Sequence, residues 1–370
     1  MKKTLLFLCV LIFVSVNASE SPTKPRGLEN LGNTCYINSV LQCLFAIPTF
    51  RDDLEKIGTS KRFLPSSSTI TLNLYHLLQE YKKSNYPIEP SNFFSCISAK
   101  QILGSGVDLY SQQDATEFYE RLMQSLHPQR TVKQIFGVSY KTEIKSDSPD
   151  FAPPAIEHTN EFLVKASKNY FSGEQGVEKT ILDFFQKSVK EEVTVQRAGR
   201  NRVFETQQQN ILTDAQSILV IGAPRYNEDY TKNLMPIWSD LTPFSIKVKK
   251  NNKETFYWYE LIGSVLHTGD TMNSGHYIAV TRYGKDWYYC SDTIVEKKSS
   301  GDVKAILQGA TGFATVLFFF EKDLEAEREH NKTIVEIRKN ESTPSIMKRM
   351  FTRQSQGSSS KAGSSLLNID

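Results

Sequence analysis

The sequence predicts an α+β fold in which a helical part precedes a β-rich part. Before about residue 128, apolar residues recur at spacings of three and four, which is the period of a helix. From about residue 135 onward, short apolar or alternating runs lie between turn residues, as is typical of strands. We find no internal repeat. A cleft between a helix of the first part and the sheet of the second is therefore the expected place for a functional site.

Helical periodicity occurs in four stretches of the chain. They are the residues between Cys35 and Pro48, residues 71–82, the segment that begins at Ser111, and residues 178–190. Ser111 and Asp114 have the spacing of a capping box, so a helix is expected to start at Ser111. Strands are expected at residues 135–144, 217–223, 244–248, 256–266, 276–282, 287–290 and 314–320.

The composition limits the classes of function. The net charge of the 370 residues is only +3, so no basic excess indicates a nucleic-acid partner. The five cysteines, at positions 9, 35, 43, 96 and 290, are too sparse for a disulfide framework. No two of them have the CxxC spacing of cysteine-rich zinc sites. We therefore expect no nucleic-acid partner, no metal and no other cofactor.

The N-terminus has the form of a secretory signal peptide. Two lysines precede an apolar run at residues 4–16, and the small residues that follow suit cleavage after Ala18. We therefore expect a signal peptide at residues 1–18, a lead-in at residues 19–26 and secretion of the mature protein. A retained signal anchor is the alternative, but the apolar run is short for crossing a bilayer.

The C-terminal segment differs in composition from the rest of the chain. Residues 321–340 are highly charged and compatible with a helix, and residues 354–365 are rich in Gly and Ser, which predicts disorder. The basic segment 347–353 could contact a membrane surface, but a solvated tail is the simpler interpretation. We therefore expect a main domain at residues 27–322, followed by a charged helix and a disordered tail at residues 323–370.

Cys35 is placed where a turn passes into a helix. Glycines and asparagines between residues 27 and 33 predict a tight turn, and Asn33 or Thr34 can cap the helix that follows. At a helix N-terminus, the unpaired amide groups and the positive end of the dipole favour a thiolate, which is the nucleophilic form of cysteine. A buried structural cysteine is the alternative.

Nucleophilic catalysis by cysteine needs a histidine within hydrogen-bond reach and a third polar group that orients the ring. His276 is the best placed of the six histidines, because it follows Gly275 at the end of the loop 267–275 and begins a strand. The glycines of this loop allow the backbone to approach a ligand closely. His267 is the rival base, and a structural role is the alternative for His276.

The next predicted strand ends in Ser291 and Asp292, so either side chain could reach the imidazole. A carboxylate is the stronger partner because it stabilises the imidazolium ion, whereas a simple turn residue is the alternative for Asp292. Asn30, five residues before Cys35, and the nearby backbone amides suit hydrogen bonding to an oxyanion. Stabilisation of the turn is an equally good role for Asn30 on spacing alone.

Three motifs in the sequence resemble those of one family. GLENLGNTCYINSVLQCLF, from residue 27, resembles the cysteine box of the ubiquitin-specific proteases, and SGHYIAVTRYGKDWYYCSDTIV, from residue 274, resembles their histidine box. SQQDATEF, from residue 111, resembles the QQDxxEF motif between the two boxes. The resemblance covers about residues 27–322 in the order of the family, so it is much more specific than a Cys–His pair alone.

The resemblance implies a papain-like cysteine protease with a helical thumb, a β-rich palm and fingers. It also implies hydrolysis of the bond after the C-terminal glycine of ubiquitin, so ubiquitin or ubiquitinated proteins would be the partners. By position, Cys35 would be the nucleophile, His276 the general base and Asn30 the side-chain donor to the oxyanion.

The third motif of the resemblance implies a channel for the substrate. Gln113, Asp114 and Glu117 would border the narrow channel that receives the tail of ubiquitin. Asp114 would hold the backbone of the tail, and Gly275 would let it pass close to the loop before His276. A solvated helix residue is the alternative for Glu117.

Two features depart from the pattern of the family. Ser291 and Asp292 stand where the family usually has Asp or Asn followed by Asp, so the third catalytic residue is open. We favour Asp292 because of its charge, and direct orientation of His276 by Ser291 is the alternative. Many members hold zinc in the fingers through two CxxC pairs, but about residues 133–212 contain no cysteine, which predicts metal-free fingers.

Two other functions compete with this interpretation. A ubiquitin-binding pseudoenzyme would result if the changed third position left His276 badly oriented, and a papain-like protease of general peptides would fit the secretory signal. The intact Cys35 and His276 argue against the first, and the SQQDATEF motif argues against the second. Because ubiquitin is intracellular, our hypothesis is that the producing cell exports this protein to act in a eukaryotic host. A protein found only in the producer's cytosol, with Met1 retained, would contradict that hypothesis.

Overall fold

The computed structural model describes residues 22–333 except 60–67, 100–101, 105, 107, 109, 127–129, 153–156, 166–175, 198–199, 224, 226–231, 233–236, 252, 272–273 and 331. The predicted signal peptide and the predicted disordered tail lie outside the described residues. The chain divides into two compact units, residues 1–322 and residues 323–370. In the second unit, a carboxylate oxygen of Asp323 accepts hydrogen bonds from the N–H groups two and three residues later, and it caps a helix at residues 324–330.

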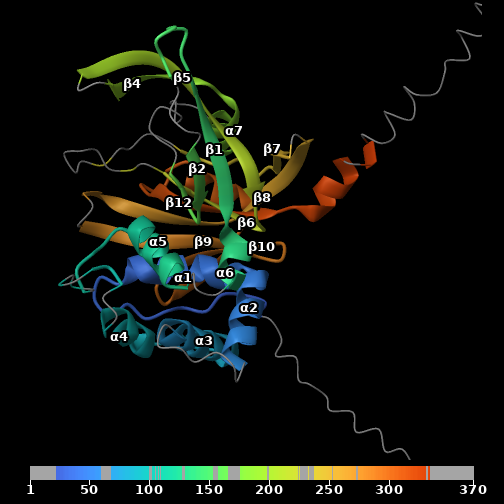
Figure 1. The fold of residues 1–370 in the computed structure, drawn as a ribbon. Coiled ribbons are helices and arrows are strands. Elements are labelled where there is room, and N and C mark those ends of the chain that lie inside the picture. The colour runs from blue at the N-terminus through green and yellow to red at the C-terminus, as the bar shows by residue number, and fades with distance from the viewer. Residues whose placement is uncertain are drawn as a thin grey trace, which may run out of the picture. The chain divides into compact units, whose positions relative to one another are not determined.

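The first unit is built around helix α1 (Cys35–Ala46), whose 12 residues are all buried. The helix packs against α5 (Ala115–Leu126) and against strand β9 (Ser274–Tyr283) (Figure 1). Its buried polar side chains join it to other segments, and the amide of Gln42 donates to the carbonyl of Arg26 at 2.6 Å. The expected helix between Cys35 and Pro48 is confirmed, and Cys35 is its first residue.

Further helices lie beside α1 in the first part of the chain. They are α2 (Pro48–Thr59), α3 (Ser68–Lys83), α4 (Ser91–Ala99) and α6 (Arg130–Phe136). Helix α3 confirms the helix expected at residues 71–82, whereas the sequence did not predict α2 or α4. Pro48 does not simply end α1 but also starts α2, because proline is well tolerated in the first turn of a helix.

The expected start of α5 at Ser111 is wrong. The helix begins at Ala115, and Asp114 Oδ1 accepts a hydrogen bond from the N–H of Thr116 at 2.6 Å. The hydroxyl of Ser111 instead donates to the carbonyl of Asp108 at 2.7 Å, inside the preceding loop. Asp114 is therefore the N-cap itself, and the capping box with Ser111 does not form.

A large sheet, which we call the palm sheet, has the strand order β11-β10-β9-β8-β12-β6-β3, and β7 also pairs with β8. Its strands besides β9 are β3 (Val164–Lys165), β6 (Ile218–Gly222), β7 (Phe244–Lys250), β8 (Lys253–Thr271), β10 (Asp286–Ser291), β11 (Ile294–Lys298) and β12 (Ala314–Lys322). The predicted strands from residue 217 onward are confirmed. Strand β11 and helix α8 (Ser300–Leu307) were not predicted.

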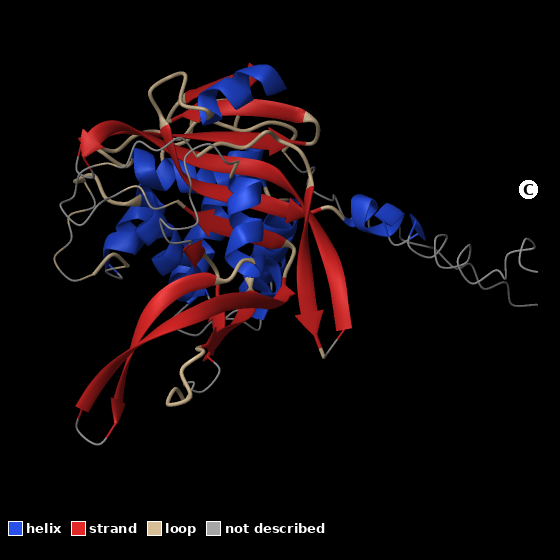
Figure 2. Ribbon diagram, turned by 90° about the horizontal axis from the view of Figure 1, so that it is seen from above, coloured by secondary structure: helices blue, strands red, loops and turns tan. Residues whose placement is uncertain are grey.

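A second sheet, which we call the fingers sheet, has the order β2-β1-β5-β4. Its strands are β1 (Val138–Lys145), β2 (Glu157–Glu161), β4 (Val189–Arg197) and β5 (Arg200–Ala215). The β4–β5 hairpin projects from the rest of the unit (Figures 1 and 2). Most residues of β5 are exposed or half-buried, so the hairpin lacks the apolar alternation that would have predicted it.

Among the described residues there is neither a metal-binding cluster nor a membrane-spanning helix. No three His, Cys, Asp or Glu side chains within the described ranges are grouped so that they could hold a metal ion. None of the described helices has the length and apolar character needed to cross a bilayer.

Two predicted boundaries near the fingers sheet are wrong. The strand expected at residues 135–144 begins only at Val138, because α6 continues to Phe136. The helix expected at residues 178–190 is α7 (Val177–Gln186), and Val189 already belongs to β4. In both places consecutive elements contribute apolar residues to the core, so the apolar pattern does not break where the structure changes.

The first turn of α7 contains a carboxyl group that is largely removed from water. The hydroxyl of Ser239 donates a hydrogen bond to Glu178 Oε1. Burial raises the pKa of Glu178 from 4.5 to about 7, although the Ser239 hydrogen bond lowers it. The folded state therefore binds this proton more tightly than the unfolded state does. Its contribution to stability should fall as the pH rises from about 4.5 to about 7.

We expect Glu178→Gln to raise the Tm at pH 8 by about 1–2 °C, the change that about 1 kcal/mol produces in a chain of this size. The substitution removes a carboxylate that is costly to bury and keeps an oxygen that can accept from Ser239. The gain should shrink at pH 5, where the wild-type side chain is protonated in the folded state. Calorimetry at both pH values measures this, with the exposed Glu192→Gln as the matched control. A gain in Tm that is the same at both pH values would contradict the raised pKa of Glu178.

Candidate active site

The turn before α1 is held by the side chain of Asn30. Asn30 Oδ1 accepts hydrogen bonds from the N–H groups of Gly32 and Thr34, at 3.1 and 3.0 Å. Gly32 and Asn33 have positive φ values of 102° and 54°, a conformation that glycine and asparagine adopt most readily. Thr34 is the N-cap residue, but its side chain bonds within the turn and not to the helix. Cys35 follows directly.

Burial controls the protonation of the Cys35 thiol. Its Sγ accepts a hydrogen bond from the N–H of Tyr277 at 3.5 Å, which lowers the pKa. Burial nevertheless raises the pKa of Cys35 to about 11, and the nearby Asp292 carboxylate contributes to the rise. Burial therefore opposes the thiolate that a helix N-terminus favours, and the pKa of Cys35 lies above the usual value of a thiol. The resting thiol is protonated at neutral pH.

The histidine that was preferred from the sequence directly precedes the residue whose N–H contacts this thiol. His276 belongs to β9 and directly precedes Tyr277, whose N–H faces the sulfur. His276 Nε2 lies 2.8 Å from the hydroxyl oxygen of Ser291 and 3.9 Å from Asp292 Oδ2. The pairing of β9 with β10 brings the two segments together. The structure thus brings Ser291 and Asp292 to the ring of His276, with the serine nearer, and joins Cys35 to the neighbouring Tyr277.

The carboxylate of Asp292 connects the end of β10 to the turn and to α1. Asn30 Nδ2 donates to Asp292 Oδ2 at 2.9 Å, and Asn38 Nδ2 donates to Asp292 Oδ1 at 2.8 Å. The N–H of Leu28 donates to the main-chain carbonyl of Asp292 at 2.9 Å. Asn38 was not predicted as a site residue. The sequence contains one sign of a special role for Asn38, which is that its polar side chain interrupts the apolar pattern of the helix.

The rival base, His267, occupies a different position. It lies inside β8, is fully buried, and its Nε2 is 2.7 Å from the side-chain nitrogen of Gln112. Its ring packs on that of Tyr277, with the ring centroids 4.3 Å apart. Burial, with the nearby Lys232 charge, lowers the pKa of His267 to about 3. His267 is therefore a neutral structural contact between the palm sheet and the segment before α5. The sequence interpretation did not identify Gln112.

The remaining predicted residues lie on or beside α5 and at the start of β9. The loop expected at residues 267–275 is wrong, because β8 continues to Thr271 and β9 begins at Ser274. Asp114 caps α5 through Oδ1, and burial raises its pKa. The amide of Gln113 donates to the hydroxyl of Ser111 at 2.7 Å. Glu117 is exposed and pairs with Arg121 one turn later at 2.7 Å.

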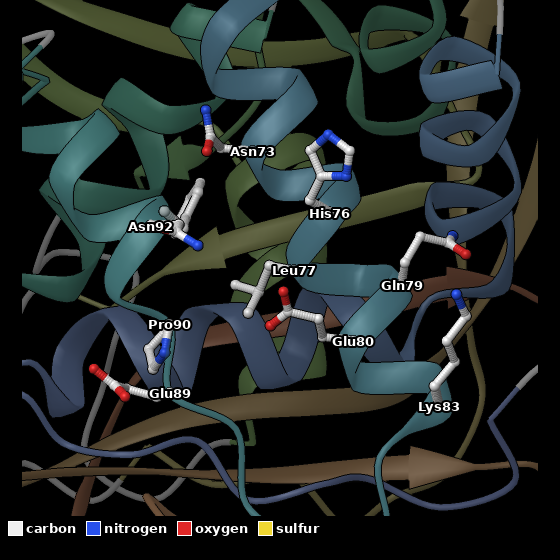
Figure 3. Close-up of a pocket in the computed structure, with 10 residues that line it drawn as sticks. Asn73, His76, Leu77, Gln79, Glu80, Lys83, Glu89, Pro90 and Asn92 are labelled. Atoms are coloured by element: carbon white, nitrogen blue, oxygen red, sulfur yellow. The ribbon is translucent and has the colours of Figure 1, made fainter.

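A cavity of about 350 Å³ opens between α3 and α4 (Figure 3). Its lining includes His76, Glu80 and Lys83 of α3, and Glu89, which precedes α4. No residue of the candidate site lines it. This cavity is therefore separate from the place where the thiol and the imidazole meet.

Gly275 is required by the close pairing of β8 and β9. Its φ is +135°, and a Cβ at this position would lie 1.8 Å from the carbonyl oxygen of Thr268. We expect Gly275→Ala to lower the Tm more than Gly284→Ala does. Gly284 also has a positive φ, but nothing lies within 4 Å of its Cβ position. Thermal unfolding of both variants measures the difference, and equal losses would show that the backbone does not need this close approach.

Comparison with known proteins supports the resemblance noted in the sequence. Ubiquitin carboxyl-terminal hydrolase 25 of Arabidopsis thaliana is 25% identical over 324 residues, which cover 75% of this chain and 45% of that protein. Ubiquitin carboxyl-terminal hydrolase 46 of Caenorhabditis elegans is 26% identical over 343 residues, which cover 73% of this chain and 79% of that protein. The chain thus spans less than half of the first relative and most of the second.

The fold also matches a solved structure. The Ubp8/Sgf11/Sus1/Sgf73 DUB module of SAGA, bound to ubiquitin aldehyde, gives a TM-score of 0.61 at 20% identity, over 80% of this chain and 69% of that chain. The fold is therefore the α+β, papain-like architecture, with α1 and α5 in the helical thumb, the palm sheet opposite them, and the projecting fingers sheet. The family description "ubiquitin carboxyl-terminal hydrolase" matches residues 26–319, and the chain belongs to that family.

Proposed function

We propose that this protein is a cysteine-type deubiquitinating hydrolase that cleaves the bond after the C-terminal glycine of ubiquitin. Membership of the family supports the reaction class, and solved neighbours bound to ubiquitin aldehyde and to monoubiquitin support ubiquitin as the ligand. The observation that carries the proposal is the contact of Cys35 Sγ with the N–H of Tyr277. This contact joins the thiol to the residue that follows His276, whose ring Ser291 contacts, and it supports the assignment of Cys35 and His276 as the catalytic pair.

The first step is transfer of the thiol proton to His276. Nε2 is engaged by Ser291, so Nδ1 is the ring nitrogen that accepts the proton. The thiolate then attacks the carbonyl carbon of the last glycine of ubiquitin. The imidazolium returns its proton to the departing amine as the C–N bond breaks. Water, deprotonated by His276, hydrolyses the thioester, and the products are a carboxylate and the restored thiol.

The oxyanion of each tetrahedral intermediate needs hydrogen-bond donors. The backbone N–H of Cys35 lies at the N-terminus of α1, where amide groups have no partner within the helix. The Asn30 amide carries two hydrogens and uses one of them for Asp292, so the second can serve the oxyanion. Asn30 would then have two roles, because its oxygen stabilises the turn.

The third catalytic position is shared between two residues in this proposal. Ser291 fixes the orientation of His276 by its 2.8 Å contact. Asp292, at 3.9 Å, supplies the negative charge that stabilises the imidazolium and holds Asn30 in place. We retain Asp292 as the residue with the larger effect, since a serine hydroxyl carries no charge.

The tail of ubiquitin would run between α5 and the start of β9. Asp114 suits the role of holding the tail's backbone, because Oδ1 caps the helix and the carboxylate has a second oxygen. Gly275 would line the opposite side. Gln113 and Glu117 remain predictions for this channel, and their side chains bond within their own segment.

The proposal for localisation rests on the sequence. Secretion through a signal peptide at residues 1–18, with delivery into a host cell, explains why an exported protein would act on ubiquitin. This segment lies outside the described residues, so the sequence pattern alone supports the proposal.

Ubiquitin with a C-terminal electrophile is expected to label the purified protein covalently at Cys35, and Cys35→Ala should abolish labelling. Mass spectrometry of the intact protein measures the adduct. Cys43→Ala is the matched control, because Cys43 is a buried cysteine on the same helix. Reversible ubiquitin binding without an adduct would favour the pseudoenzyme. Cleavage of ordinary peptides without an adduct would favour a general protease.

Asp292→Ala is expected to lower kcat by about 10²–10⁴-fold, and Ser291→Ala by a smaller factor, because a lost charge partner costs a general base more than a lost neutral hydrogen bond. Kinetics with ubiquitin carrying a C-terminal coumarin amide measure both. Asp292→Asn keeps the shape of the side chain and tests the charge. A loss confined to Ser291→Ala would overturn the assignment to Asp292.

A further inference from the structure

The side chain of His267 contacts both neighbours of the proposed general base. In the pairing of β8 with β9, His267 is opposite Tyr277, and Thr268 is opposite His276. The ring of His267 packs on the ring of Tyr277, with the centroids 4.3 Å apart. On the other side of His276, a Cβ on Gly275 would lie 2.8 Å from His267 Nε2. The imidazole of His267 therefore limits where the two residues that flank His276 can lie.

The ring of His267 is itself held from the helical part of the chain. Its Nε2 lies 2.7 Å from the side-chain nitrogen of Gln112, a residue that is only 7% exposed. An amide nitrogen can only donate a hydrogen bond, so Nε2 is the acceptor and the ring proton is on Nδ1. Gln112 stands two residues before Asp114, which caps α5. The contact therefore joins the segment before α5 to the strand pair that carries His276.

A lysine fixes the backbone of β8 at the same place. The ammonium group of Lys232 donates to the carbonyls of His267 and Gly269, at 2.8 and 2.9 Å. These two residues flank Thr268, whose own carbonyl oxygen would lie 1.8 Å from a Cβ on Gly275. Both the side chain and the backbone of His267 are thus held where β8 approaches Gly275.

Burial keeps the ring of His267 neutral. It lowers the pKa of His267 to about 3, and the nearby charges of Lys232 and His276 contribute to the lowering. The ring therefore takes up no proton at neutral pH and keeps an acceptor nitrogen for Gln112. A neutral ring of such low basicity does not suit proton transfer, but it suits a fixed contact.

Tyr277 connects His267 to the nucleophile. The N–H of Tyr277 donates to Cys35 Sγ at 3.5 Å, and the ring of Tyr277 packs against that of Tyr36, with the centroids 6.5 Å apart. A shift of Tyr277 would therefore move the N–H at the sulfur together with His276, the preceding residue. A misplacement of about 1 Å can lower the rate of an enzyme by about 10²-fold.

We propose that His267 is a positioning residue for the reaction at Cys35 and His276. It fixes Gly275 and Tyr277, which sets the place of His276 between them, and Gln112 holds the ring of His267. The inference rests on the proposed function. In this role His267 acts through its neighbours in β9 and transfers no proton itself.

Substitutions at His267 and Gln112 test the role by steady-state kinetics with ubiquitin carrying a C-terminal coumarin amide. His267→Leu removes the acceptor nitrogen but keeps a side chain of similar size. We expect it to lower kcat by about 10–10²-fold while KM changes by less than about twofold. His267→Gln keeps a polar group that can bond to Gln112, so it should recover part of the loss.

Gln112→Leu removes the same contact from its other side and should lower kcat in the same way. The double variant of His267→Leu and Gln112→Leu should lose no more than the more affected single variant, because both changes act through one contact.

A second measurement needs no ubiquitin. The rate at which iodoacetamide alkylates Cys35, measured by peptide mass spectrometry at a series of pH values, reports the ionisation of the thiol. In the proposed mechanism His276 accepts the thiol proton. A displaced imidazole should therefore move the alkylation profile of His267→Leu to higher pH than that of the wild type.

Tyr259→Phe is the matched control, because Tyr259 is a buried ring of the same strand whose hydroxyl donates to the carbonyl of Gln216 at 2.8 Å. It should lower the Tm without changing kcat or the alkylation profile. An unchanged kcat and profile in His267→Leu, or an equal loss of kcat in Tyr259→Phe, would overturn the proposal. A wild-type protein that neither cleaves the coumarin substrate nor reacts with electrophilic ubiquitin would defeat the proposed function. The alkylation profiles would then still decide whether His267 positions the residues around Cys35.

Discussion

The carboxylate of Asp292 makes the contacts on which the geometry of the candidate site depends. Its two oxygens accept hydrogen bonds from Asn30 and Asn38, which lie 262 and 254 residues away in the sequence. Hydrogen bonds to a charged acceptor are stronger than those between neutral groups, and each of these joins the helical part to the palm sheet. The backbone of Asp292 has a φ of +50°, which aspartate tolerates better than most residues. The turn of the nucleophile and the strand end facing the imidazole therefore keep a fixed relation.

Two opposing effects act on the thiol, and their balance determines how the reaction can start. The N-terminus of α1 and the N–H of Tyr277 favour negative charge on the sulfur, whereas burial of Cys35 opposes it more strongly. A thiolate in this position is therefore stable only together with a positive charge beside it. In the proposed mechanism, His276 supplies that charge when it accepts the thiol proton.

Apolar patterns predicted α1 and the palm strands because these elements have regular buried faces, and β6 is buried at all five positions. Apolar patterns failed to predict the β4–β5 hairpin, whose residues are mostly exposed or half-buried. Motif order predicted Cys35 and His276 as a pair, and the residue after His276 contacts Cys35 Sγ. The third position could not be decided from the sequence, because Ser291 and Asp292 are neighbours and the turn conformation sets which side chain reaches the ring. Asn38 and Gln112 were missed because their partners are far away in the sequence.

The burial of Cys35 also affects how the protein would tolerate oxidants. Peroxides and disulfides react with thiolates, and a thiol whose pKa is about 11 offers very little thiolate at neutral pH. The other cysteines of the described residues, Cys43, Cys96 and Cys290, are buried as well. Oxidation at these positions would therefore be slow compared with that of an exposed, ionised cysteine. On the proposed route of export, burial would therefore help to keep the Cys35 thiol reduced.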